Sequence, residues 1–389
     1  MYMKKVLILF LLTLIPLQSF AASLEVAGWI PWWQDSLGIA SAEDHLRDLD
    51  IIYPFAFEVR NDGTLVDKAG LDDREWERFV SKAGRKNVDV LPSVMWFDGA
   101  AIHSVLSSKS KRSDHIEEIV DMVEDGDYDG VNIDYEGKLA DTIDYFSLFL
   151  EELEDELGRK DLSCTIEART PPESLYREVP AVIQYANDYE AMAEHCDWVE
   201  IMAYDQQRAD LSLNSLRQGE PYIPVADTDW VEKVIELALE DIPADKILLG
   251  VPTYGRQWEL TVAPDWYKGY DSIGAINLPD AEELADDYDV RSGRNKADEA
   301  SYTYFHKDSP FSILNALPVP KGTRRGFEAA AKALLFANLS GMTVPVRIVW
   351  YSDAEAIEAK VELAEKYDLK GIAIFKIDGE EDEDIWDLF

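Results

Sequence analysis

Histidine, cysteine and basic residues are all scarce in this 389-residue sequence. The five histidines include no pair at the spacing of metal ligands, and the two cysteines are not clustered. We therefore expect no metal site and no bound cofactor. Lysine and arginine together number 37 against 77 aspartates and glutamates, which gives a formal net charge of −40. A protein of this charge repels nucleic acid and anionic lipid, so we expect no nucleic-acid partner.

One long apolar run is present, and it lies at the N-terminus. Residues 6–17 follow Lys4 and Lys5 and precede Ala21 and Ala22. This order is typical of a secretory signal peptide, here residues 1–21, so we expect a secreted protein or a periplasmic or cell-envelope location. The run is too short for a comfortable membrane span, and stable membrane insertion is expected only if the signal stays uncleaved.

The two cysteines, Cys164 and Cys196, occur in apolar segments that we place on neighbouring strands. An exported protein meets oxidising conditions, which allow one disulfide between them. Two buried free thiols are the alternative, and the sequence does not decide between the two.

Short apolar, β-branched or aromatic runs recur along the chain, without an internal repeat or a low-complexity linker. Stretches with the 3.6-residue periodicity of helices lie between most of them. Strands that alternate with helices imply a parallel sheet with right-handed crossovers, and eight strands in a chain of this length indicate an α/β fold, the (β/α)8 TIM barrel, over residues 22–389. The expected strands are residues 26–33, 51–59, 88–96, 128–135, 162–168, 198–204, 247–254 and 371–377.

One interval between an expected strand and the next expected barrel helix is much longer than the others. About one hundred residues separate the seventh run, which ends at residue 254, from the helical stretch that begins at residue 354. They include strand-like residues 301–305 and 346–351 and helix-like residues 326–338. We predict a small α+β insertion, residues 259–345, between strand seven and helix eight, where it would form a wall on one side of the barrel mouth.

Residues 129–136 read Asp-Gly-Val-Asn-Ile-Asp-Tyr-Glu. Side chains alternate between the faces of a strand, so Asn132, Asp134 and Glu136 share one face. A row of polar groups on a core strand is costly unless it is paired or used, and barrel enzymes keep their chemistry at the C-terminal ends of strands. These three residues are therefore catalytic candidates, and a buried ion pair or polar layer is the purely structural alternative.

The segment resembles the DGxDxDxE signature of glycoside hydrolase family 18, the chitinase-like barrels. Residues 202–205 resemble the family's MxYD motif, and residues 250–256 resemble its G-[IVL]-P-x-Y-G-R motif, in the expected order. The insertion resembles the family's extra α+β domain, so the resemblance covers nearly all of the mature chain. It implies a glycoside hydrolase for polysaccharides that contain β-1,4-linked N-acetylglucosamine, with chitin oligosaccharides and peptidoglycan both open. We expect a monomer, although the sequence does not determine the oligomeric state.

The resemblance also implies a mechanism and residue roles. Retaining glycosidases normally use a second carboxylate as nucleophile, but this family uses the acetamido oxygen of the substrate. Glu136 would be the acid and then the base, with its pKa raised by burial and by Asp134. Asp134 would accept the acetamido N–H, Tyr204 would donate its hydroxyl to the acetamido oxygen, and Asp205 would bind sugar hydroxyls.

Two departures from the family pattern bear on activity. Asn132 stands where the family usually has an aspartate that shares a proton with the central one, although Asn132 could still hydrogen-bond to Asp134. Chitobiase-type and spore-cortex-lytic members show a similar substitution, and we predict a displaced acid limb of the pH profile. Phe375 replaces the usual tryptophan under the sugar and offers less stacking area. The alternative is a weak or inactive chitinase-like lectin, against which the presence of Glu136 argues.

Further substrate-binding candidates lie at the ends of expected strands. Trp33, Trp96 and Phe57 could be platforms for sugar rings or ordinary packing residues. Tyr254 belongs to the motif of strand seven, and Arg256 could orient acids at the mouth or form a plain salt bridge. The alternation of side chains places Glu167 and Glu200 on the inner faces of their strands. A role in the substrate groove is open for Glu167, whereas Glu200 is expected to be paired inside the barrel.

Overall fold

The computed structural model describes residues 24–217 and 219–389. The signal peptide predicted at residues 1–21 lies outside this range. No helix in the described residues is long and apolar enough to cross a membrane.

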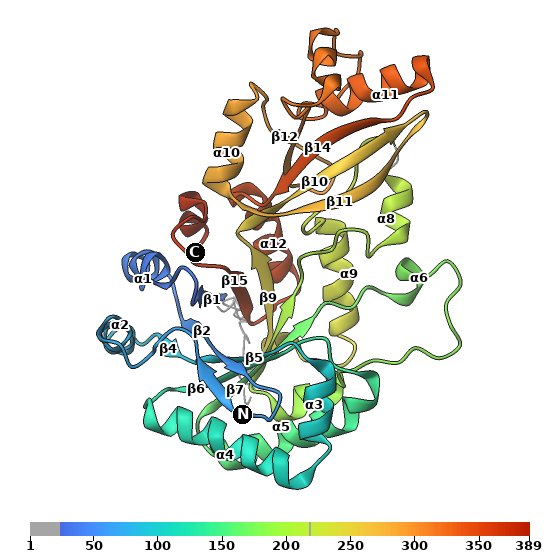
Figure 1. Cartoon of the computed structure of the whole chain (residues 1–389). Coiled ribbons are helices and arrows are strands. Elements are labelled where there is room, and N and C mark those ends of the chain that lie inside the picture. The colour runs from blue at the N-terminus through green and yellow to red at the C-terminus, as the bar shows by residue number, and fades with distance from the viewer. Residues whose placement is uncertain (1–23, 218) are drawn as a thin grey trace, which may run out of the picture.

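Eight parallel strands form a closed barrel (Figure 1). Each strand pairs with the next, and β1 pairs with both β2 and β15, which closes the ring. This confirms the predicted (β/α)8 TIM barrel. A short β4 (Asp89–Val90) and an antiparallel β3 (Leu65–Asp67) also pair with β2. The barrel strands are β1 (Glu25–Pro31), β2 (Ile51–Val59), β5 (Ser93–Trp96), β6 (Gly130–Tyr135), β7 (Asp161–Glu167), β8 (Trp198–Met202), β9 (Ile247–Pro252) and β15 (Gly371–Phe375).

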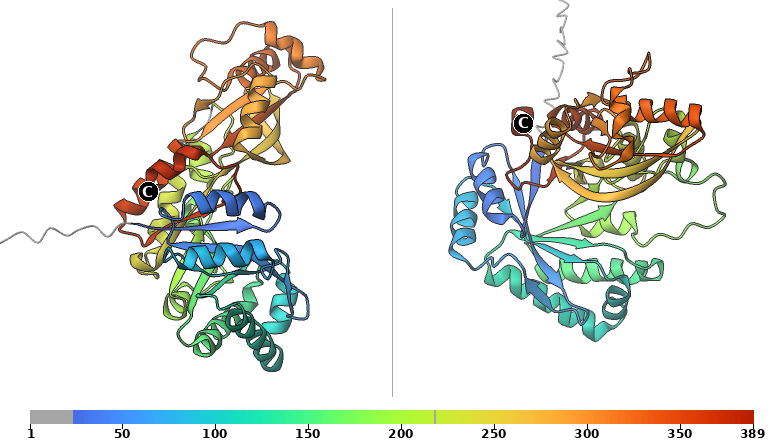
Figure 2. Two further views of the ribbon diagram at one scale, coloured as in Figure 1. Left: turned by 90° about the vertical axis from the view of Figure 1, so that its left-hand side faces the viewer. Right: turned by 45° about the horizontal axis from the view of Figure 1, so that its top comes forward.

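Helices surround the barrel (Figure 2) and bury its outer face. In α5 (Ile143–Leu157), Phe146, Phe149, Leu150 and Leu153 repeat at helical spacing and are buried, while the acidic residues between them face outward. The other helices along the barrel chain are α1 (Asp35–Asp44), α2 (Arg74–Gly84), α3 (Gly99–Leu106), α4 (Lys109–Asp125), α6 (Pro172–Leu175), α7 (Tyr189–His195), α8 (Leu211–Leu216), α9 (Thr228–Ala238) and α12 (Ala354–Lys366). Short 3₁₀ helices cover Ala140–Thr142, Ala244–Lys246, Pro310–Ala316 and Glu383–Leu388.

A second, antiparallel sheet is inserted between β9 and α12, and it rises beyond the C-terminal end of β9 (Figure 1). It begins at Tyr254 and ends at Tyr351, so it is wider than the predicted range of 259–345. At its start the difference arises because β10 follows β9 after a single residue, Thr253. The sheet has the order β11-β10-β14-β13-β12. Its elements are β10 (Tyr254–Ala263), β11 (Trp266–Asn277), α10 (Leu278–Asp287), β12 (Gly293–Arg294), β13 (Ala300–Tyr304), α11 (Glu328–Ser340) and β14 (Val344–Tyr351).

The two cysteines form a disulfide, with 6.1 Å between the Cα atoms of Cys164 and Cys196. Cys164 lies on β7, whereas Cys196 lies between α7 and β8 rather than on a strand. The alternative of two free thiols is therefore wrong, because the approach to β8 runs directly beside β7 and brings the two residues together.

Candidate active site

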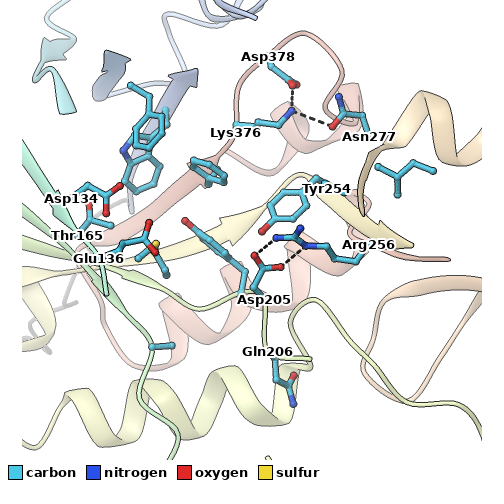
Figure 3. A pocket seen from close by; sticks show the side chains of 18 of the residues that line it. Asp134, Glu136, Thr165, Asp205, Gln206, Tyr254, Arg256, Asn277, Lys376 and Asp378 are labelled. Carbon is cyan, nitrogen blue, oxygen red and sulfur yellow. Dashed lines mark hydrogen bonds and ion pairs between the residues drawn. The ribbon is translucent and has the colours of Figure 1, made fainter. Parts of the chain in front are cut away.

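A cavity of about 710 Å³ opens at the C-terminal ends of the barrel strands (Figure 3). Asp134 and Glu136 of the β6 segment both line it. Asp134 is only 3% exposed, and its Oδ1 has no hydrogen-bond partner among the described residues. The outward side chains of β6, Val131 and Ile133, pack in the hydrophobic layer under the helices. The polar row of β6 thus faces the interior of the barrel and ends at the cavity.

Asn132 lies one step deeper than these carboxyls and is fully buried. Its Nδ2 donates to the hydroxyl of Ser163 at 2.7 Å and to Oε2 of Glu200 at 3.2 Å. No hydrogen bond joins Asn132 to Asp134 in the described chain, so that expectation is wrong. Residues two apart on a strand are about 6–7 Å apart along the chain, whereas side chains of neighbouring strands are closer. Glu200 also accepts a hydrogen bond from the hydroxyl of Tyr53, and it is paired inside the barrel as predicted.

Burial and neighbouring charge set the protonation of the two cavity carboxyls. Burial, together with the charges of Glu167 and Asp205, raises the pKa of Glu136 to about 7, and the charge of Lys138 opposes this rise. Burial, followed by the charge of Glu136, holds the pKa of Asp134 well above its usual range. A carboxyl that keeps its proton near neutral pH can act as a general acid.

An aromatic box encloses one side of the cavity. The ring of Phe375 stacks on Tyr204, with 5.6 Å between centroids and 16° between planes. Tyr254, Phe55 and Trp29 contact the same ring edge-on at 6.2, 6.0 and 5.9 Å. Burial keeps the pKa of Tyr204 well above its usual range, so its hydroxyl remains a hydrogen-bond donor. Such a box can hold the face of a sugar ring beside a phenol donor.

Trp33 lies at the rim of the same cavity. Its side chain is 47% exposed and lines the opening. Its ring meets Phe55 edge-on, with the centroids 6.0 Å apart. An exposed indole in this position is available as a platform for a sugar unit outside the aromatic box.

Two predicted substrate-binding residues do not reach the cavity, and these predictions are wrong. Trp96 packs against Tyr135 at 5.5 Å in the helical layer, because Met95 takes the inward position at this end of β5. Phe57 also faces the helical layer, since the pairing of β2 with β5 is irregular between Phe55 and Phe57. Phe55, which the sequence analysis did not select, lines the cavity in its place.

Asp205 and Arg256 form a two-point ion pair on the cavity wall (Figure 3). The Nε of Arg256 lies 2.8 Å from Oδ1 of Asp205, and Nη2 bonds to Oδ2. The sequence left open a salt bridge or the orientation of acids for Arg256, and this ion pair is compatible with both, because Asp205 is itself an acid that lines the cavity. Tyr254, buried beside this pair, completes the wall.

Several lining residues escaped the sequence analysis because they come from the insertion and from the loop after β15. Nζ of Lys376 pairs with Asp378 and lies 3.1 Å from Oδ1 of Asn277. The amide of Asn277 in turn bonds to Glu380, a member of an acidic run that reads as a solvated loop. Nothing in the sequence places Asn277 near β15, since the two are brought together only by the insertion.

Comparison with known proteins agrees with this architecture. Residues 34–380 match the family model described as Glycosyl hydrolases family 18. The chain is 20% identical over 290 residues to the uncharacterized glycosylase YvbX of Bacillus subtilis, covering 75% of this chain and 69% of YvbX. It is 23% identical over 273 residues to the cortical fragment-lytic enzyme of the same organism, covering 70% of this chain but 52% of that enzyme.

The fold is shared with solved structures as well. The chitinase from Chromobacterium violaceum superposes with a TM-score of 0.68 at 19% identity, over 94% of this chain and 98% of that one. At this identity the likeness shows the common fold. Because the family model extends from the segment after β1 to the loop after the last barrel strand, the chain belongs to glycosyl hydrolases family 18 and is a glycoside hydrolase.

Proposed function

We propose that this protein is exported and hydrolyses glycans that contain β-1,4-linked N-acetylglucosamine, chitin oligosaccharides or peptidoglycan, by substrate-assisted retaining catalysis. The observation that carries the proposal is the pair Asp134 and Glu136, two inward carboxyls with raised pKa values at one cavity. Relatives named as a chitinase and as a cortical fragment-lytic enzyme support this class of substrate.

In the proposed reaction, the proton of Glu136 passes to the glycosidic oxygen as the bond to the anomeric carbon breaks. The acetamido oxygen of the same sugar forms a new bond to that carbon, which gives an oxazolinium ion. The unpaired Oδ1 of Asp134 accepts the acetamido N–H, and the hydroxyl of Tyr204 donates to the acetamido oxygen. Water then attacks the anomeric carbon as the bond from this carbon to the acetamido oxygen breaks, and Glu136 takes a proton from the water, so the configuration is retained.

The remaining cavity residues hold the sugar. Phe375 supplies a flat apolar surface under the ring, and the ion pair of Asp205 with Arg256 presents carboxylate and guanidinium groups to sugar hydroxyls. Trp33 offers a further stacking surface at the rim. None of these groups has to move a proton, so they contribute to binding rather than to the bond-breaking step.

The test measures release of a fluorophore from chitobioside and chitotrioside, and of reducing sugar from purified peptidoglycan. The wild type should turn over at least one of them, and Glu136→Gln should lose about 10²-fold or more in kcat while still binding. Unchanged turnover by Glu136→Gln, or binding without turnover by the wild type, would contradict the proposal. N-terminal sequencing of the exported protein should find a chain that starts near Ala22.

A further inference from the structure

Glu167, the last residue of β7, joins two loops at the cavity. Its Oε1 accepts the backbone N–H of Gly137 at 2.9 Å, and its Oε2 accepts a hydrogen bond from Nδ2 of Asn187 at 3.2 Å. Gly137 directly follows Glu136 and has φ of 63°, so it forms the tight turn at the end of β6. One carboxylate therefore connects the turn behind Glu136 to the loop that precedes α7.

This anchor is itself held in place. Asn187 is buried, and its backbone carbonyl accepts a hydrogen bond from the guanidinium of Arg169. That guanidinium lies between the rings of Tyr185 and Tyr189, 3.9 and 3.7 Å from their centroids. Cation–π contacts on both faces hold the guanidinium, and hence the loop, in one arrangement. The carboxylate of Glu167 is thus fixed from two sides rather than free in solvent.

The charges around Glu136 come from four elements. Asp134 and Lys138 lie on β6 and just after it, Glu167 on β7, Asp205 after β8, and Arg256 on β10. After burial, the charge of Glu167 is the largest influence that raises the pKa of Glu136, ahead of the charge of Asp205.

The other charged groups near Glu136 contribute less. Arg256 neutralises Asp205 by their two-point ion pair. The positive charge of Lys138 lowers the pKa of Glu136, with a smaller effect than the charge of Glu167. Glu167 is therefore the acidic neighbour on another strand that is best placed to act on Glu136.

We propose that Glu167 is a positioning residue for the reaction: it anchors the turn behind Glu136 and fixes a negative charge beside the acid–base carboxyl. This rests on the proposed role of Glu136 as the acid. Glu167 does not have to touch the substrate or exchange a proton. Its effect is to keep the proton on Glu136 until the glycosidic oxygen takes it.

Glu167→Gln isolates the charge from the anchoring. The glutamine oxygen can still accept the N–H of Gly137. Oδ1 of Asn187 has no partner within the described chain, so a rotated Asn187 amide can accept a hydrogen bond from the new glutamine N–H. The matched control is Glu178→Gln, which removes one charge from an exposed position in the same loop region. Glu167→Asp keeps the charge but is too short for both anchors.

The readout is the pH dependence of kcat/KM, together with direct titration of the Glu136 carboxyl by ¹³C NMR. In Glu167→Gln the basic limb and the NMR titration should move down by about one pH unit, since a like charge has been removed. In Glu178→Gln neither should move. In Glu167→Asp, which keeps the charge but frees it from both anchors, the limb should move less than in Glu167→Gln while kcat falls.

If the basic limb of kcat/KM does not move in a folded Glu167→Gln variant, the inference is wrong. The same holds if kcat/KM falls equally at every pH without a shift of that limb. If Glu167→Gln does not fold, an unchanged kcat in Glu167→Asp would overturn it instead. The failure of the proposed function is a separate result, because it would appear as undiminished turnover by Glu136→Gln.

Discussion

Replacing Asn132 by aspartate would place a second carboxylate against the buried Glu200. The Nδ2 of Asn132 donates to Oε2 of Glu200 at 3.2 Å, and an aspartate has no N–H group to replace this donor. Burial raises the pKa of Glu200 to about 7, so in the wild type this carboxyl is mostly ionised by pH 8. Two adjacent carboxylates cannot both ionise in a dry site, and the pair must keep a proton.

The expected loss of stability follows from these contacts. A hydrogen bond to a charged acceptor is worth about 2 kcal/mol. Keeping the shared proton bound at pH 8, one unit above a pKa of about 7, costs about 1.4 kcal/mol more. The free energy of unfolding of Asn132→Asp should therefore fall by about 3 kcal/mol at pH 8. The pKa of the carboxyl pair is raised in the folded state, so the free energy of unfolding of Asn132→Asp decreases as pH rises through 7. The difference in stability from the wild type should therefore be smaller at pH 5.5 than at pH 8.

Urea denaturation of the wild type and Asn132→Asp at pH 5.5 and 8 measures the effect. The control is the double variant Asn132→Asp/Glu200→Gln, which exchanges the amide and the carboxyl and should recover most of the loss at pH 8. Equal stability of Asn132→Asp and wild type at pH 8, or a loss that neither depends on pH nor is recovered by the double variant, would refute the reasoning. Asn132→Asp should also move the acid limb of the pH profile, and an unchanged limb would refute coupling to Asp134.

Further predictions concern binding, stability and pH. Phe375→Ala should raise KM for chitotrioside about tenfold through lost stacking, while Trp96→Phe in the helical layer should leave KM unchanged. Removing the disulfide by Cys164→Ala/Cys196→Ala should lower the free energy of unfolding by about 4 kcal/mol in chemical denaturation, given the separation of 32 residues. In the wild type, kcat/KM should be retained below pH 7 and lost above it, since Glu136 with a pKa of about 7 must be protonated to act as acid; a basic limb above pH 9 would contradict this.

The barrel could be predicted because its signals are local. Apolar runs of strand length that alternate with helical periodicity mark each β and α element without reference to distant residues. The inward row of Asn132, Asp134 and Glu136 was predictable for the same reason, since side chains alternate along one regular strand. The predicted border of the insertion was less accurate, because only Thr253 separates β9 from β10 and no turn signal marks the change of sheet.

The alternation of side chains no longer predicts which residues face inward where the pairing of two strands is irregular. The irregularity between Phe55 and Phe57 turns Phe57 toward the helices, and no residue type in that segment indicates that the pairing is irregular there. Trp96 faces the helical layer because the inward side at the end of β5 belongs to Met95. Aromatic residues pack well on either face, so composition could not decide which ring lines the cavity.

The sequence by itself determined the barrel and the polar row on β6, and it selected Glu136 as the candidate for the acid, because each depends on residues that are close along the chain. The tertiary structure decided which side chains meet across strands: Asn132 with Glu200, Glu167 with Asn187, and Lys376 with Asn277 of the insertion. These contacts depend on strand register and loop paths. Both are set by the packing of segments that are far apart in the sequence, and a local pattern does not record them.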